Sequence, residues 1–251
     1  MVIILKKFFI SYYSVFIHQN FPYTILGVIS RMFIKKYFII LSTVLLCFNT
    51  VSANPIPPPT VSQVTIEIHV FIEGFYNTPC NCTVSDTVQV LLYFQGQSES
   101  QWLKQTGILD EGGYVTVTFS NVPSDNFFLG IKHKNSMRTW SSVLMAPSAA
   151  MTYDFTMSQS TAFGNNLVKM SNNKCCLYSG DVDKNGFIDS NDLMLIVNDF
   201  DGTGNGPMPT DITGDGTVDE SDMELCYNNT LKHVREYRPT SLDFIVPVTG
   251  D

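Results

Sequence analysis

Apolar and polar residues alternate along five stretches in the first two thirds of the chain. In each stretch every second residue is apolar, which is typical of a β-strand with one buried face. The apolar positions are Val64, Ile66, Ile68, Val70 and Ile72; Val88, Val90, Leu92 and Phe94; Val115, Val117 and Phe119; Phe127, Leu129 and Ile131; and Met151, Tyr153 and Phe155. Residues 61–158 are therefore predicted to form an antiparallel β-sandwich of about a hundred residues.

The apolar period changes to a helical one near the C-terminus. One set of apolar residues recurs at helical spacing after residue 192, and a second set does so less cleanly after residue 222. These sets are Leu193, Ile196, Val197 and Phe200, and Met223, Cys226, Tyr227 and Val234. The predicted fold class is mainly β, an antiparallel β-sandwich followed by a small α-helical module.

A twelve-residue acidic loop precedes each predicted helix, and the two loops are aligned copies offset by thirty residues. Oxygen-bearing side chains occupy positions 1, 3, 5, 9 and 12, and glycine occupies position 6. This spacing wraps a hard cation in oxygen ligands, with a backbone carbonyl at position 7. The predicted ligands are Asp181, Asp183, Asn185, Phe187, Asp189 and Asp192 in the first loop, and Asp211, Thr213, Asp215, Thr217, Asp219 and Asp222 in the second.

The composition of the two loops indicates which ion they take. Four carboxylates in twelve residues repel one another, and a divalent cation removes that repulsion. All-oxygen ligation favours Ca²⁺ over Mg²⁺; the competing interpretation is a pair of acidic, solvated loops without an ion. Thr213 is a weaker ligand than a carboxylate, so two calcium sites are predicted, the first stronger. Apolar Ile188 and Val218, at position 8, are expected to join the loops through a short β-bridge.

The segments before the loops indicate which kind of calcium module this is. A full EF-hand has a helix before each loop, but Cys175–Gly180 reads as extended, and the Gly- and Pro-rich segment 202–210 cannot be helical. Tandem loop–helix units with aspartate at position 12 and a Gly-Asp-Val-Asp start resemble a type I dockerin module. The resemblance spans residues 178–238. It also extends to secreted bacterial proteins in which such a module follows a β-sandwich, whose motifs have counterparts in His133–Trp140.

The resemblance implies a function as well as a fold. Dockerins are calcium-dependent modules that attach enzymes or binding modules to cohesin domains of scaffold proteins, often in assemblies that degrade polysaccharide. By this resemblance the chain is a non-enzymatic interaction protein with a cohesin-like partner. Loop positions 10 and 11, where dockerins tend to carry a pair of small hydroxyl residues, are Ser190-Asn191 and Glu220-Ser221. The run from Thr118 to His133 is similar to transthyretin-like and carboxypeptidase-regulatory-like sandwiches, which concerns fold alone.

The charge of the chain is concentrated in this module. The 251 residues carry a formal net charge of −8, while residues 178–238 hold thirteen Asp and Glu against four Lys and Arg. The acidity therefore belongs to the cation loops. The sequence has no basic stripe, so no nucleic-acid partner is expected.

The N-terminus reads as an export signal. Lys35 and Lys36, a short apolar core and the small residues Val51-Ser52-Ala53 have the order of a secretory signal that starts at Met32. We expect residues 1–53 to be a leader that is removed, and the chain to be secreted with no stable membrane span. A membrane anchor is the rival reading, but the apolar run is short for a span of about 20 residues. A Pro-rich linker, 54–60, follows.

The mature cysteines are Cys80, Cys82, Cys175, Cys176 and Cys226. An exported chain can oxidise them, and a bond from Cys80 or Cys82 to Cys175 or Cys176 would join the sandwich to the start of the module. Because the number is odd, at least one thiol stays free or pairs with another chain. Zinc binding by Cys-x-Cys is the weaker alternative.

Two other functions remain open from the sequence. The loop around Trp140 could bind a glycan by stacking the indole on a sugar ring, although a packed Trp140 is the favoured interpretation. A small carbohydrate-active hydrolase would need two carboxylates facing a cleft, and no catalytic motif is present. Residues 159–177 are predicted to be a linker, 178–238 the calcium module, and 239–251 a tail.

Overall fold

The structure of the chain is a computed structural model, and it describes residues 60–200 and 208–239. The predicted leader, the choice of Met32 as start, and nearly all of the 54–60 linker and the 239–251 tail lie outside the described residues. Residues 58–251 group into one unit, so the sandwich and the helical module belong together.

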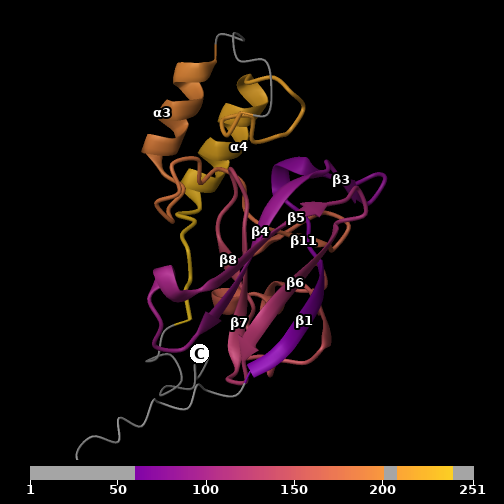
Figure 1. Ribbon diagram of the computed structural model, residues 1–251. Helices are drawn as coiled ribbons and strands as arrows, with labels where there is room; N and C mark the ends of the chain where they lie inside the picture. The colour runs from indigo at the N-terminus through magenta and orange to yellow at the C-terminus, as the bar shows by residue number, and fades with distance from the viewer. Residues whose placement is uncertain (1–59, 201–207, 240–251) are drawn as a thin grey trace, which may run out of the picture. The chain divides into compact units, whose positions relative to one another are not determined.

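Two sheets form the first part of that unit (Figure 1). The four-stranded sheet has the order β5 (Leu103–Leu109), β4 (Asp86–Phe94), β7 (Phe127–Lys132) and β8 (Thr139–Trp140). The three-stranded sheet has the order β6 (Tyr114–Pro123), β1 (Thr60–His69) and β9 (Ala150–Asp154). Neighbouring strands are antiparallel except β1 and β9, which run parallel. The predicted sandwich is confirmed, with this one parallel pair as a correction to its purely antiparallel topology.

Shorter elements complete the described chain. The two-residue strands are β2 (Tyr76–Asn77), β3 (Cys82–Thr83), β10 (Val168–Lys169) and β11 (Cys175–Cys176). The 3-10 helices are η1 (Glu73–Phe75), η2 (Glu99–Gln101), η3 (Gln159–Thr161) and η4 (Phe163–Asn165). The two α-helices are α3 (Ser190–Asp199) and α4 (Glu220–Leu231), which lie side by side. The helical period therefore predicted both helices correctly, although Phe200 is the C-cap of α3 and Val234 lies beyond the end of α4.

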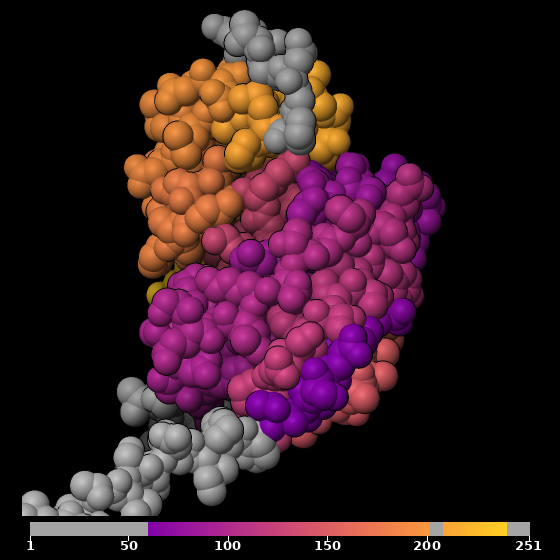
Figure 2. Space-filling view, viewed as in Figure 1, coloured from indigo at the N-terminus to yellow at the C-terminus, as the bar shows by residue number. Residues whose placement is uncertain are grey.

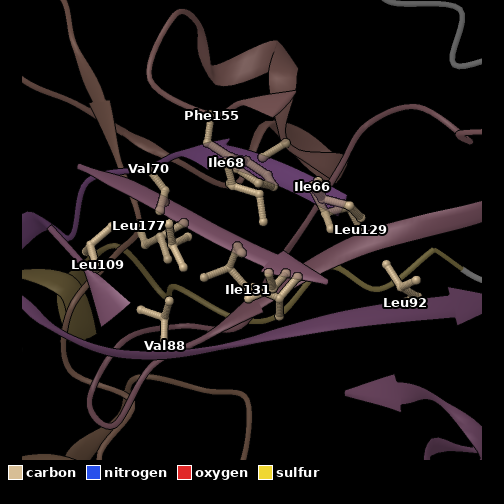
Figure 3. Close-up of a cluster of buried hydrophobic side chains, with 14 of the residues drawn as sticks. Ile66, Ile68, Val70, Val88, Leu92, Leu109, Leu129, Ile131, Phe155 and Leu177 are labelled. Carbon is tan, nitrogen blue, oxygen red and sulfur yellow. The ribbon is translucent and has the colours of Figure 1, made fainter. Parts of the chain in front are cut away.

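The main core lies between the two sheets. Alternate residues of β1, such as Ile66 and Ile68, face alternate residues of β4 and β7, such as Leu92 and Leu129 (Figure 3). All four side chains are fully buried. Burial of a large aliphatic side chain stabilises a fold by about 1.5–3 kcal/mol, so this layer is the main source of the sandwich's stability.

The segment between the sandwich and the module is part of the sandwich core. Ala162, Leu167, Cys175 and Leu177 are buried in the same cluster as the strand residues. Residues 159–177, which the sequence assigns to a linker, thus cover the sandwich rather than cross open solvent. The segment's apolar residues follow neither a helical nor a strand period between the Ser, Asn and Lys residues, so the sequence pattern did not indicate their burial.

The outer face of the four-stranded sheet is aromatic and covered. Leu91, Tyr93, Trp102, Phe128 and Trp140 form a buried cluster of their own. Trp140 is completely buried, and its indole Nε1 donates to Glu236 Oε1 at 2.7 Å. An indole in this position cannot stack on a sugar, so Trp140 is a packing residue and the glycan platform suggested for it is wrong.

Candidate metal centre

Both helices of the module begin at an aspartate of the acidic loop. Asp189 is the N-cap of α3 and accepts a hydrogen bond from the Asn191 N–H at 2.7 Å, while Asp192 bonds back to the Asp189 N–H at 2.9 Å. Asp219 and Asp222 form the same capping box at α4. Such reciprocal bonds satisfy N–H groups that a helix start leaves free. The loop sequence therefore fixes where each helix begins.

The aspartate at position 12 also folds the loop back on itself. Asp192 is fully buried, and its Oδ1 accepts hydrogen bonds from the backbone N–H groups of Val182 and Asp183, at 2.8 and 3.1 Å. In the second loop Asp222 Oδ1 accepts from Thr213 N–H at 2.9 Å. Each loop is thus closed between its third and last positions.

Three carboxylates of the first loop converge. One oxygen each of Asp181, Asp183 and Asp192 lies within 4.8 Å of the others, with Asp181 and Asp192 buried and Asp183 exposed. Hard cations such as calcium bind carboxylate oxygens that surround a common point. The exposed Asp183 leaves this point accessible from solvent. The oxygen ligands of this loop therefore fit calcium. The Asn185 side chain lies next to them, and its Nδ2 donates to Asp183 Oδ2 at 2.9 Å.

Burial and nearby negative charges raise the pKa of the two buried carboxyl groups of the first loop, Asp181 and Asp192. Burial, together with the charges of Asp192 and Asp183, raises the pKa of Asp181 to about 6. Burial also raises the pKa of Asp192 and that of Asp222. Carboxylates that resist ionisation for these reasons are stabilised by a nearby cation. The same burial lowers the pKa of the Lys184 ammonium, which donates to the Asp181 carbonyl, to about 8.

The second loop is closed by a similar backbone hydrogen bond, but its carboxylates do not converge as those of the first loop do. Asp211 is buried, but its carboxylate accepts hydrogen bonds from the N–H groups of Gly214 and Gly216, at 2.7 and 3.1 Å. Among residues 60–200 and 208–239, a cluster of three acidic groups occurs in the first loop and not in the second. Thr213 stands where the first loop has Asp183, so the difference follows from the sequence.

The glycine at position 6 is required in both loops. Gly186 has a φ of 85° and Gly216 a φ of 93°. A side chain is strained at such angles. The turn at each glycine brings the backbone of position 7 next to the side chain of position 5. The Phe187 N–H donates to Asn185 Oδ1 at 2.7 Å, and the Thr217 N–H donates to Asp215 Oδ1 at 2.9 Å.

The predicted bridge between Ile188 and Val218 is wrong. Both side chains are buried in the module core, but the first loop pairs with the segment after α4. The Ile188 N–H donates to the Val234 carbonyl at 2.9 Å, and Phe187 bridges Arg235. The chain that leaves α4 runs antiparallel to the first loop and takes up its backbone hydrogen bonds.

The predicted pairing of the cysteines is wrong as well. Cys80 and Cys82 form a disulfide with each other. Only one residue lies between them, on the short hairpin of β2 and β3. Cys175, Cys176 and Cys226 are buried free thiols, so free thiols remain as predicted. The oxidised Cys80–Cys82 pair has no thiolate to offer zinc.

The family of the module follows from its sequence. Residues 179–231 match the family model of the dockerin type I domain. The C-terminal module is a dockerin-type module. The match begins two residues before the first loop and ends at the last residue of α4, so it covers both loop–helix units of the dockerin-type module and none of the sandwich.

Comparisons of the whole chain add little. Two solved structures are similar to it, an N-terminal and a C-terminal interface mutant of a type II cohesin–X–dockerin complex from Acetivibrio cellulolyticus. In each case the identity is 13%, the match covers 69% of this chain and 96% of that chain, and the TM-score is 0.41. A similarity of this size carries no argument about this chain. No curated protein sequence matches it.

Within residues 60–200 and 208–239, no helix has the length and the apolar character needed to span a bilayer.

Proposed function

We propose that this chain is a secreted, non-enzymatic docking protein whose dockerin-type module binds two calcium ions and attaches the β-sandwich to a cohesin-type partner. The observation that carries the proposal is the convergence of Asp181, Asp183 and Asp192 inside a loop of the dockerin family. In the first loop the ligands would be these three with Asn185, the Phe187 carbonyl and Asp189. In the second loop they would be Asp211, Thr213, Asp215, the Thr217 carbonyl, Asp219 and Asp222.

Calcium would supply the charge that orders the module. Without a cation, the acidic groups of the first loop are held by backbone N–H donors and by the Asn185 side chain. Burial disfavours the ionised forms of Asp181 and Asp192. Because the unfolded chain lacks the site, the free energy of calcium binding would add to the folding stability of the module. The first loop, with three converging carboxylates, would bind calcium more tightly than the second.

The surface of α3 supports docking. Ser190, Met194 and Val197 share one face of the helix at helical spacing, and all three are exposed, Met194 by 55% and Val197 by 44%. α3 forms part of the orange surface in Figure 2. Exposed apolar side chains gathered on one element are typical of an interaction surface.

The corresponding face of α4 is different. Thirty residues further along the chain, the same positions are Glu220, Glu224 and Tyr227. Two carboxylates there oppose the desolvation that docking requires. We therefore infer that α3 is the docking helix and that a link to polysaccharide degradation would come through the partner.

Binding to a panel of recombinant cohesin domains, measured by calorimetry, tests this proposal. We expect binding in calcium, loss of binding in EDTA, and a loss of at least tenfold with Val197→Asp, because a charge would be buried in an apolar contact. Tyr227→Asp, at the matched position of α4, is the control and should retain affinity. Absence of binding to every cohesin in calcium, or equal losses with the two variants, would contradict the proposal.

A further inference from the structure

A loop of the sandwich reaches the start of the first calcium loop. The segment between β7 and β8 pairs with the residues that lead into Asp181: Ser136 forms an antiparallel bridge with Ser179. The Met137 N–H donates to the Tyr178 carbonyl at 2.8 Å, and the Gly180 N–H donates to the Asn135 carbonyl at 2.7 Å. The backbone just before the first ligand of the first loop is thus hydrogen-bonded to the sandwich.

The same asparagine reaches the first residue of the second loop. Asn135 is fully buried, and its side-chain Nδ2 donates to the backbone carbonyl of Asp211 at 2.7 Å. Asn135 therefore bonds through its main chain beside position 1 of the first loop, and through its side chain to position 1 of the second. One residue of the sandwich is thus hydrogen-bonded to the backbone at the start of both loops.

A second, independent part of the sandwich meets the second loop at its next residue. A Cβ on Gly74, in η1, would lie 1.9 Å from the Ile212 carbonyl oxygen, so the loop backbone approaches the sandwich too closely for any side chain. The Gly74 N–H also donates to Ser179 Oγ at 3.0 Å. Gly74 therefore contacts the approach to the first loop and the body of the second.

The contact continues into the helices and the module core. Glu73 Oε2 accepts from the Asn229 side chain of α4 at 2.6 Å and from the Ser179 N–H at 3.2 Å. Met137 is fully buried in the same cluster as Ile188, Ile212 and Val218 of the module. A sandwich residue thus fills part of the core that the two loops share.

We propose that Asn135 is a positioning residue for calcium binding: it fixes the first ligand of the second loop relative to that of the first, so that the sandwich contributes to the module's calcium affinity. The inference rests on the proposed calcium binding. The physical reason is preorganisation, since a loop already held in its binding conformation loses less entropy when the ion binds. The effect should be larger in the second loop, because the bond to that loop is made by the side chain.

Calcium titration calorimetry of the purified full chain tests the inference. Binding to each loop is measured separately in backgrounds that inactivate the other, Asp181→Ala for the second loop and Asp211→Ala for the first. We expect Asn135→Ala to weaken calcium binding to the second loop by about five- to tenfold, the usual effect of one lost buried hydrogen bond. The first loop should lose less.

Two further variants keep the test decisive. Ser141→Ala removes a buried hydroxyl of the sandwich that bonds Leu129 N–H and the Val143 carbonyl, away from the loops; it should destabilise the sandwich and leave both calcium affinities unchanged. Gly74→Ala displaces the second loop from a different segment and should also weaken the second site, which carries the test if Asn135→Ala does not fold.

The outcomes separate the inference from the proposed function. If the wild-type chain binds calcium but a folded Asn135→Ala variant leaves the second site unchanged, the positioning role is wrong and calcium binding stands. If Asn135→Ala does not fold, an unchanged second site in Gly74→Ala overturns the positioning role in the same way. If Ser141→Ala weakens calcium binding to both loops as much as Asn135→Ala does, the effect is a general loss of stability. This result would also overturn the inference. A wild-type chain that binds no calcium overturns both.

Discussion

Arg138 and Glu236 are joined by two hydrogen bonds, from Nε to Oε1 at 2.7 Å and from Nη2 to Oε2 at 2.8 Å. Arg138 belongs to the loop before β8, and Glu236 belongs to the segment after α4. Both side chains are largely buried, 14% and 13% exposed, and the Trp140 indole donates to the same carboxylate. This contact holds the segment that pairs with the first acidic loop.

Removal of the Glu236 carboxylate should be strongly destabilising. Glu236→Ala leaves the Trp140 N–H without its partner and leaves the Arg138 guanidinium with Glu99 alone, at 2.7 Å. Loss of one member of such a buried pair costs about 3 kcal/mol. The free energy of unfolding, measured by urea denaturation in calcium, checks this. Arg238→Ala is the matched control: this side chain is 37% exposed, and its loss should cost about 1 kcal/mol or less. Equal effects of the two variants would contradict the account.

The strand pattern was predictable because one face of each sheet packs into the main core, which sets an apolar residue at every second position. Alternation located β1, β4, β6, β7 and β9, but not β5, an edge strand in which only Leu109 is fully buried. The loop–helix units were predictable for a different reason: ligand spacing and N-caps are local. The contact of Asn135 with Asp211 spans 76 residues, and no local pattern encodes it. The polar segment His133–Ser136 reads as a surface loop, although His133, Asn135 and Ser136 are buried.

The thiols should differ sharply in reactivity. Burial raises the pKa of the Cys226 thiol to about 12 and also raises the pKa of Cys176, so neither forms the reactive thiolate. After mild reduction, we expect iodoacetamide at pH 8 to label Cys80 and Cys82, and to label Cys176 and Cys226 only in denaturant. Peptide mass spectrometry measures this. Labelling of Cys226 in the folded chain as fast as that of Cys80 would refute the prediction.

The buried imidazole of His133 should make stability depend on pH. Burial lowers the pKa of His133 below its usual value of 6.5, and the hydrogen bond from His133 holds the pKa of Asp86 well below its usual range. Because the folded-state pKa of His133 is the lower one, its contribution is present above pH 6.5 and is lost as the pH falls below that value. The Asp86 contribution is lost only below about pH 3.8, the ordinary aspartate value.

The difference between the wild-type chain and His133→Gln in urea denaturation between pH 7.5 and 5 therefore isolates His133, because Glu73, whose pKa is raised by burial, is common to both proteins. The wild-type chain should lose stability on acidification through this range, and His133→Gln, which does not titrate, should show a flatter profile from a lower starting value. Both sets of denaturation experiments need saturating calcium, so that the carboxylates of the loops do not contribute to the pH dependence of stability. Parallel profiles for the two proteins would show that His133 is not responsible.

Direct counting of bound calcium tests the central claim. In equilibrium dialysis of the purified chain, we predict two calcium ions per chain, with affinities of about 10⁻⁴ M or tighter. Asp181→Ala should remove the tighter site and Asp211→Ala the weaker one. A chain that binds no calcium at millimolar concentration, or that keeps both sites in the two variants, would contradict the account.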